Sequence, residues 1–148
     1  MTTPSASPDV DAVVIGAGFG GMYAPHKLRE LDFTTRGFEA GSDVGGTWFW
    51  NRYPGARCDV ESLSYSYSFD PELVNGWRWS ERYATQPEIL SYAQWVADRL
   101  DLRALFSFNT RIRAARFDEG SDTWEITTHT GSITRARFLI TAVGCLSA

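Results

Sequence analysis

The sequence is poor in several residue types, and each scarcity excludes a class of protein. Lys27 is the only lysine, and the chain carries a net charge of -4 with a pI near 5.1. Nucleic acids and anionic membranes attract clustered positive charge, so we expect neither as a partner. The sequence contains no apolar run approaching the roughly 18 residues that a membrane-spanning helix needs.

Cysteine and histidine are also scarce. Cys58 and Cys145 lie far apart and form no CxxC pair, which is typical of a protein of the reducing cytoplasm. The sequence allows a disulfide between them but gives it no support. His26 and His129 are isolated, without another cysteine or histidine at ligand spacing, so no metal site is expected.

The composition indicates one globular domain. With 43% hydrophobic and 14% aromatic residues, 148 residues are enough for one core and short for two. The first ten residues are rich in Ser, Thr and Pro and lack the basic and apolar regions of a signal peptide. We therefore expect a disordered tail over residues 1–10 and a single domain over residues 11–148.

The first apolar segment leads into a glycine motif. Ala12 to Ile15 indicates a short strand, and a helical pattern follows the glycines. The glycines have GxGxxG spacing, at Gly16, Gly18 and Gly21, with Gly20 as an extra. In dinucleotide-binding folds the first glycine forms the turn, the second admits the pyrophosphate, and the third lets helix and strand pack closely. The helix N-terminus attracts the phosphates.

Glu39 follows a second expected strand, roughly Thr34 to Phe38. At this distance from the glycines, an acid accepts hydrogen bonds from an adenosine ribose. A carboxylate there repels the additional phosphate of NADP, so this nucleotide is expected to be FAD or NAD. The alternative is a glycine-rich turn followed by a surface glutamate.

The clearest helix is predicted in the middle of the chain. Thr85 and Glu88 have capping-box spacing, and Pro87 suits a first helical turn. Apolar residues recur at helical spacing and indicate a core-facing stripe: Ile89, Leu90, Ala93, Val96, Ala97 and Leu100.

A three-strand meander is expected after this helix. Its strands are roughly Arg111–Phe117, Thr123–His129 and Ile133–Val143, joined by turn sequences. The run from Phe138 to Ile140 is continuously apolar, which is typical of a strand buried on both faces.

Residues 45–59, GGTWFWNRYPGARCD, carry large aromatics and arginines with neither helical nor strand period. Together with GAGFGG, YATQPEIL and ARFLITAVG, this segment resembles the N-terminal FAD-binding part of Baeyer-Villiger monooxygenases. The resemblance runs from about Asp9 to Ser147, and residues 45–59 are its most specific piece. It implies an α/β fold: a Rossmann-like FAD-binding domain with a parallel sheet, an inserted helical region and a β-meander, truncated at its end.

The resemblance also implies site residues. Asp59 is the candidate catalytic residue, beside the flavin ring and held against an arginine that lies beyond this sequence. The implied cofactor-binding residues are Gly16, Gly18, Gly20, Gly21, Glu39, Gly46, Thr47, Trp48, Phe49, Trp50, Arg57, Cys58, Asp59, Tyr65, Ile112 and Cys145. Flat, largely apolar flavin rings select aromatic neighbours and a few placed polar groups. The alternatives are a satellite aromatic core, and an ion pair of Asp59 with Arg57 or Arg52.

The family's activity implies FAD and NADPH as cofactors, and a small-molecule ketone and O2 as substrates. One oxygen atom enters the ketone to give an ester or a lactone. Complete family members also have a second GxGxxG domain for NADPH, so the chain is interpreted as a fragment that is inactive alone. The sequence indicates neither the ketone nor the oligomeric state.

Three residues depart from the family pattern and are expected to loosen the first strand–helix–strand unit. Pro25 falls inside the expected helix, Gly37 inside the second strand, and Asp32 where a helix-ending glycine is common. Two rival functions also remain: a plain NAD-dependent dehydrogenase domain, and a truncated, non-catalytic fragment that binds a nucleotide.

Overall fold

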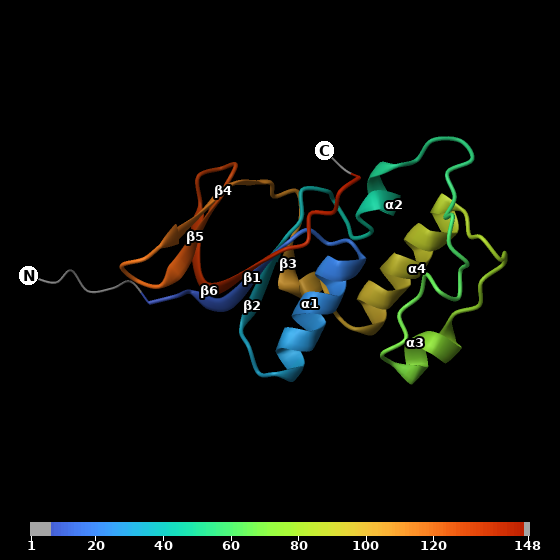
Figure 1. Ribbon diagram of the computed structural model, residues 1–148, viewed down its shortest axis with the longest axis horizontal. Helices are drawn as coiled ribbons and strands as arrows, with labels where there is room; N and C mark the ends of the chain where they lie inside the picture. The colour runs from blue at the N-terminus through green and yellow to red at the C-terminus, as the bar shows by residue number, and fades with distance from the viewer. Residues whose placement is uncertain (1–6, 147–148) are drawn as a thin grey trace, which may run out of the picture.

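The structure is a computed structural model that describes residues 7–146 (Figure 1). Its six-stranded sheet has the order β3-β2-β1-β6-β5-β4. The strands are β1 (Val10–Ile15), β2 (Thr35–Phe38), β3 (Phe106–Ser107), β4 (Ile112–Asp118), β5 (Thr123–Thr128) and β6 (Ile133–Thr141). Residues 1–6 of the expected tail lie outside the described part of the chain.

The strand pairing confirms the predicted α/β architecture. β1 pairs in parallel with β2 and β6, and β2 pairs in parallel with β3. β4, β5 and β6 form the antiparallel meander. β6 therefore belongs both to the parallel sheet and to the meander, and its carboxyl end lies beside that of β1.

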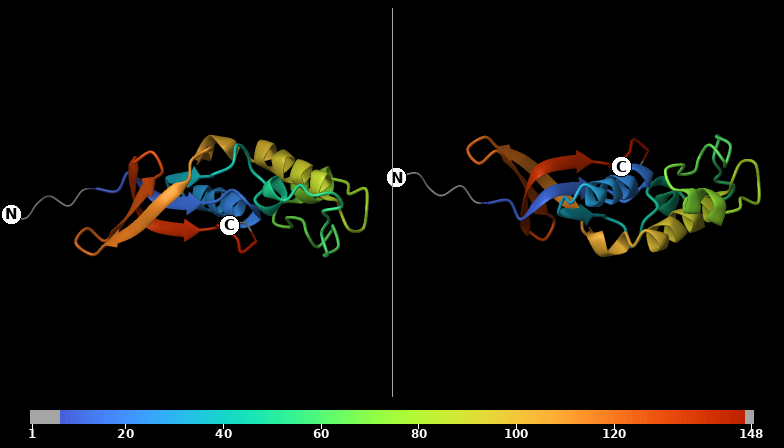
Figure 2. Two further views of the ribbon diagram at one scale, coloured as in Figure 1. Left: turned by 90° about the horizontal axis from the view of Figure 1, so that it is seen from above. Right: turned by 90° about the horizontal axis from the view of Figure 1, so that it is seen from below.

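The helices divide between the sheet and a helical lobe. They are α1 (Phe19–Glu30), α2 (Thr47–Trp50), α3 (Pro71–Gly76), α4 (Gln86–Arg99) and the short 3-10 helix η1 (Arg103–Leu105). α1 runs beside the strands, whereas α3 and α4 lie at the end of the molecule opposite the meander, and α2 packs against α4 (Figures 1 and 2).

Close packing between β1 and α1 requires the glycine motif. Gly16 has φ of +100°, and a Cβ on it would lie 2.5 Å from the carbonyl oxygen of Ala142. A Cβ on Gly21 would lie 1.9 Å from the carbonyl oxygen of Gly16. Pro25 lies inside α1 as predicted and is buried, so the carbonyl of Gly21 has no N–H four residues on to accept from.

α4 confirms the predicted apolar stripe and corrects its cap. Ile89, Ala93, Val96 and Ala97 are buried. The Thr85 side chain forms no cap hydrogen bond. Glu88 instead accepts hydrogen bonds from the backbone N–H and the hydroxyl of Ser80, at 2.7 and 2.8 Å. A tertiary partner in the preceding loop thus replaces the predicted capping box.

The expected burial of β6 on both faces is wrong. Phe138 is 46% exposed, and its nearest aromatic contact is the ring of Phe33, with centroids 5.9 Å apart. Ala136, two residues earlier and on the same face, is fully buried with Val13 and Ile126. Leu139 and Ile140 are half-buried, so among the described residues the run from Phe138 to Ile140 is only partly covered.

The sequence provides no support for a metal site, a membrane-spanning helix or a disulfide, and each expectation can be compared with the structure over residues 7–146. Residues 7–146 contain no cluster of acidic, cysteine or histidine side chains that could hold a metal ion. Within the same residues, no helix is long and apolar enough to cross a membrane. Cys58 is buried, Cys145 is exposed, and both are free thiols.

Candidate cofactor site

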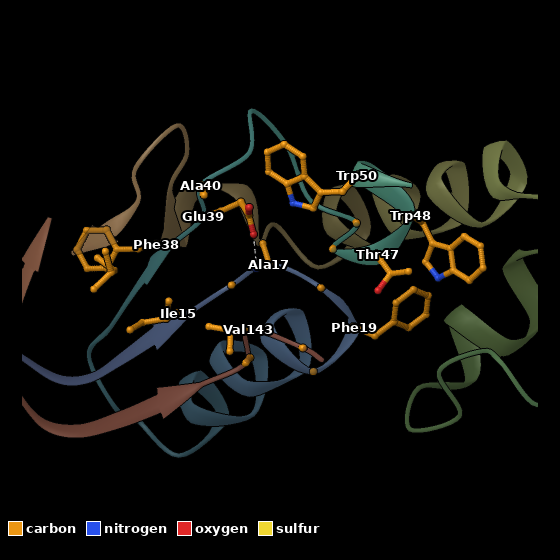
Figure 3. A pocket seen from close by; sticks show the side chains of 18 of the residues that line it. Ile15, Ala17, Phe19, Phe38, Glu39, Ala40, Thr47, Trp48, Trp50 and Val143 are labelled. Carbon is orange, nitrogen blue, oxygen red and sulfur yellow. Dashed lines mark hydrogen bonds between the residues drawn. The ribbon is translucent and has the colours of Figure 1, made fainter. Parts of the chain in front are cut away.

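One cavity of about 620 Å³ opens where β1, β2 and β6 end. The turn before α1, the loop after β2, and α2 enclose it (Figure 3). Its lining comprises Ile15, Gly16, Ala17, Gly18, Phe19, Gly20, Phe38, Glu39, Ala40, Gly45, Gly46, Thr47, Trp48, Trp50, Tyr65, Thr110, Arg111, Ile112, Ala142, Val143 and Gly144. Ligands of parallel α/β sheets bind at this edge, beyond the carboxyl ends of the strands.

The glycine turn before α1 and the Gly45-Gly46 pair before α2 lie against each other at the cavity. Gly46 has φ of +53°, and a Cβ on it would lie 2.7 Å from the Cα of Gly18. A Cβ on Gly20 would meet nothing within 4 Å, so this position is open. Gly18, the N-cap of α1, provides no side-chain cap, and the first turn has no acidic residue. The first N–H groups of α1 are therefore available to an anionic ligand.

Glu39 is buried at the end of β2 and ties the two segments together. Its Oε2 accepts a hydrogen bond from the backbone N–H of Ala17 at 2.7 Å, and its Oε1 accepts one from the N–H of Gly41 at 2.7 Å (Figure 3). Each carboxylate oxygen has two lone pairs, so both can still accept from a ligand hydroxyl. Glu39 thus shapes the cavity and presents an acceptor to it.

An aromatic wall lies at the other end of the cavity. Trp48 and Phe19 line this end (Figure 3). The indole Nε1 of Trp48 donates to the hydroxyl of Tyr65 at 3.0 Å, and the two rings meet edge to face. Burial raises the pKa of the Tyr65 phenol, so it stays protonated near neutral pH.

The loop between β2 and α2 is anchored to the helical lobe. Asp43 accepts hydrogen bonds from Arg103 Nε at 2.8 Å and from Gln94 Nε2 at 2.9 Å. Burial works to raise the pKa of Asp43, but the bonds from Arg103, the Val44 backbone and Gln94 outweigh it and lower the pKa. Gln86 donates to the carbonyl of Trp48. These bonds fix the backbone around Gly45 and α2.

Many of the residues expected from sequence lie together at this cavity. The lining includes Gly16, Gly18, Gly20, Glu39, Gly46, Thr47, Trp48, Trp50, Tyr65 and Ile112. Gly21 packs behind it against Gly16. Cys58 does not line the cavity and is buried in the same apolar cluster as Trp48. Cys145 is exposed and follows the lining residue Gly144.

Phe49 does not line the cavity. A Cβ on Gly41 would lie 2.7 Å from its ring, and Arg52 lies over the same ring at 4.9 Å. Arg57 is also outside the lining, and its Nη1 donates to Glu81 at 2.6 Å. The short helix α2 therefore divides its aromatics between the cavity and the protein surface.

Asp59 is exposed and does not line the cavity. The alternative ion pairs with Arg57 or Arg52 are absent within residues 7–146, because Arg57 pairs with Glu81 and Arg52 donates to the carbonyl of Phe49. The carboxylate of Asp59 is thus left without a cationic partner among the described side chains.

Sequence reasoning missed the part of the lining contributed by the β3–β4 connection. Thr110 donates its N–H to the carbonyl of Glu39 at 2.8 Å, and His129 donates its N–H to the carbonyl of Arg111 at 2.8 Å. These bonds bring the segment to the mouth of the cavity. These bonds join residues far apart in the sequence, so no local signal in the sequence indicates the place of Thr110 or Arg111.

The described residues fit a dinucleotide such as FAD. The cavity has the volume of a ligand site, and its two ends differ as the two ends of FAD do. The adjoining glycine segments and open N–H groups suit phosphates, Glu39 suits a ribose, and the Trp48 end suits a flat aromatic ring. A Cβ at Gly46 would force the two glycine segments apart.

Known proteins show the same arrangement. Residues 14–75 match the NAD(P)-binding Rossmann-like domain family. A Baeyer-Villiger monooxygenase of Pseudooceanicola batsensis is 53% identical over 147 residues, which are 99% of this chain and 27% of that protein. The chain thus spans about a quarter of the length of this curated relative.

Solved structures agree over the same region. Cyclohexanone monooxygenase from Rhodococcus sp. Phi1 bound to NADP+ is 51% identical with a TM-score of 0.92, over 96% of this chain and 27% of that one. OTEMO in complex with FAD and NADP is 48% identical with a TM-score of 0.92, over 97% of this chain and 27% of that one. By sequence and by fold, the chain is similar to the N-terminal part of Baeyer-Villiger monooxygenases.

Proposed function

We propose that this chain is the FAD-binding part of an NADPH-dependent flavoprotein monooxygenase that inserts one oxygen atom from O2 into a small ketone, giving an ester or a lactone. The observation that carries the proposal is the cavity in which the adjoining glycine segments, Glu39 and the Trp48 wall meet. The related proteins bound to FAD and NADP support it.

The chain's own residues bind and orient the cofactor. The N–H groups at the N-terminus of α1 would hold the pyrophosphate, and Glu39 would accept hydrogen bonds from the adenosine ribose. Trp48 and Tyr65 form the wall of the cavity at the end where the flavin ring would lie, and would exclude water from it. Gln86 donates to the carbonyl of Trp48 and fixes its backbone. Bound FAD supplies the oxygen-transfer chemistry, and these residues supply its position.

We propose Asp59 as a positioning carboxylate for a cationic group outside residues 7–146. Its support is that Asp59 is exposed in the segment that resembles the flavin site and has no cationic partner among residues 7–146, whereas the neighbouring Arg57 is paired with Glu81. A cation separated from its carboxylate is left uncompensated, so losing Asp59 costs several kcal/mol where the pair is buried.

Nucleotide titration tests the cofactor. The purified chain is titrated with FAD, NAD and NADP while tryptophan and flavin fluorescence are followed. We expect FAD to bind most tightly and Gly46→Ala to abolish its binding. Gly131→Ala is the matched control, because Gly131 also has a positive φ, +90°, in open space away from the cavity. Tighter binding of NADP, or equal effects of both substitutions, would contradict the assignment.

A chimera tests the reaction. Residues 7–146 replace the matching part of the cyclohexanone monooxygenase from Rhodococcus sp. Phi1, and NADPH consumption and formation of the cyclic ester (lactone) from cyclohexanone are measured separately. We expect both, with Asp59→Ala reducing ester formation more than NADPH consumption. Wild-type ester yield in Asp59→Ala would assign Asp59 a structural role only.

The cytoplasm is the compartment that we propose. Both described thiols, Cys58 and Cys145, are free, and free thiols persist in a reducing compartment. Trapping with a membrane-impermeant thiol reagent in intact cells should leave Cys145 unlabelled. Labelling of Cys145 under those conditions would place it outside the cytoplasm.

A further inference from the structure

A continuous series of aromatic rings leads from the cavity into the helical lobe. Trp48 and Tyr65 have centroids 5.8 Å apart, Tyr65 and Phe19 5.1 Å, and Phe19 and Tyr92 6.1 Å. Trp48, Tyr65 and Phe19 line the cavity. Tyr92, on α4, is almost fully buried beneath them. The cavity wall is therefore the first layer of a deeper aromatic cluster.

The series continues from Tyr92 to the surface. Tyr92 and Trp79 have centroids 4.9 Å apart, Trp79 and Trp77 5.8 Å, and Trp77 and Trp95 5.5 Å. Trp95 is half-buried, with the guanidinium of Arg99 over its ring at 5.7 Å. Trp79 also packs in the same cluster as Trp48. Of the six tryptophans in the chain, four thus lie on one connected route.

Packing alone does not account for the chemistry of this route. Aliphatic residues fill cores equally well, but only tryptophan and tyrosine among apolar side chains lose an electron readily. Trp77 Nε1 is buried without a hydrogen-bond partner, which is a cost that packing leaves unexplained. An indole that loses an electron and has no acceptor for its proton remains a radical cation, so it stays able to oxidise the next ring.

We propose that Trp48, Trp79, Trp77 and Trp95 form a one-electron relay between the cofactor cavity and the surface. The proposal rests on FAD occupying the cavity. Trp48 gives one electron to a one-electron oxidant in the cavity, such as a photoexcited flavin. Trp79, Trp77 and Trp95 each then pass one electron inward. Ascorbate or a thiol in solution reduces the Trp95 radical and releases its own proton to water. No bond within the relay forms or breaks.

Tyr65, Phe19 and Tyr92 bridge the tryptophans without changing charge. Burial raises the pKa of the Tyr92 phenol and outweighs the opposing effect of the hydrogen bond that its oxygen accepts from the N–H of Tyr67, at 2.9 Å. Loss of the phenolic proton there is therefore unfavourable. The expected function is protective, because an oxidising equivalent left in the cavity by a failed cycle is moved to solvent before it damages the cofactor site.

Transient absorption on the FAD-loaded chain tests the relay. After a laser flash we expect a tryptophan radical whose decay accelerates with ascorbate. Trp79→Phe should abolish this ascorbate dependence without changing the initial quenching of flavin fluorescence by Trp48. Trp95→Phe, at the half-buried end, should also abolish it with little risk to folding. Trp124→Phe is the off-route control, because Trp124 packs on Phe117 in the meander.

A second photo-oxidant makes the test independent of FAD binding. A ruthenium polypyridyl complex is attached to Cys145, which is exposed next to the cavity residue Gly144, whereas Cys58 is buried. Flash oxidation of the ruthenium should produce the same ascorbate-sensitive radical, again lost in Trp79→Phe. If FAD fails to bind but this radical forms, the relay stands and the cofactor assignment falls. Wild-type kinetics in both Trp79→Phe and Trp95→Phe would overturn the relay.

Discussion

The ring of Phe106 lies directly over the Cα of Gly37, on the neighbouring strand. A Cβ on Gly37 would lie 2.3 Å from Phe106 Cδ1, so no side chain fits there while the ring stays in place. Gly37 pairs with Phe106 in the parallel register of β2 and β3. The glycine expected to loosen β2 is instead covered by an aromatic ring, which explains its presence.

Gly37→Val is therefore expected to destabilise the fold although valine favours strands. Overpacking of this kind costs about 1–3 kcal/mol. The loss in the free energy of unfolding is measured by urea unfolding of three proteins: the wild type, Gly37→Val, and the double variant Gly37→Val with Phe106→Leu. The smaller leucine should recover part of the loss. Independent, additive effects of the two substitutions would show that the contact does not limit this position.

The contact between Phe106 and Gly37 is a feature that the sequence does not predict. The GxGxxG turn, Glu39, α4 and the meander are predictable because local spacing encodes them. The Phe106 ring over Gly37 joins residues far apart in the sequence, and nothing local indicates it. The pairing of Glu88 with Ser80 instead of a capping box, and the exposure of Phe138 in β6, have the same origin, since both depend on tertiary neighbours. Within the site, the glycines and Trp48 could be predicted, but the contribution of Arg111 could not.

Asp32 ends α1 in the left-handed conformation, with φ of +60°. Its N–H donates to the carbonyl of Arg29 and that of Phe33 donates to the carbonyl of Leu28, which closes the helix as glycine commonly does. Asp32→Gly should raise the free energy of unfolding by about 1 kcal/mol, since the left-handed cost of the Cβ disappears. Asp32→Ala is the matched control, because it removes the same charge and keeps the Cβ. Equal thermal midpoints for both variants would contradict the explanation.

Asp43 is expected to make part of the stability depend on acid pH. Its pKa is lowered in the folded chain despite burial, through bonds from Arg103, Val44 and Gln94. Because the pKa is lowered, the contribution of Asp43 to the free energy of unfolding is complete above the ordinary aspartate pKa, about 4. This contribution is lost as the pH falls through the lowered pKa. Thermal melts from neutral to acid pH should show a smaller decline for Asp43→Asn than for the wild type. Glu119→Gln is the control, because Glu119 is exposed in a turn and forms no ion pair among residues 7–146. An Asp43→Asn curve parallel to that of the wild type would exclude this role.

Glu39→Gln should separate the two roles of this carboxylate. Both oxygens accept backbone N–H groups, from Ala17 and Gly41, but an amide side chain offers only one acceptor. One buried N–H then loses its partner, at a cost of about 1–3 kcal/mol in the free energy of unfolding. FAD affinity should also fall, whereas affinity for NADP relative to NAD should rise, because the charge that repels the additional phosphate is gone. Urea unfolding and nucleotide titrations of the same preparations measure the two effects. Lower stability with unchanged nucleotide affinities would make Glu39 a structural tie alone, and unchanged stability would show that the turn before α1 does not depend on it.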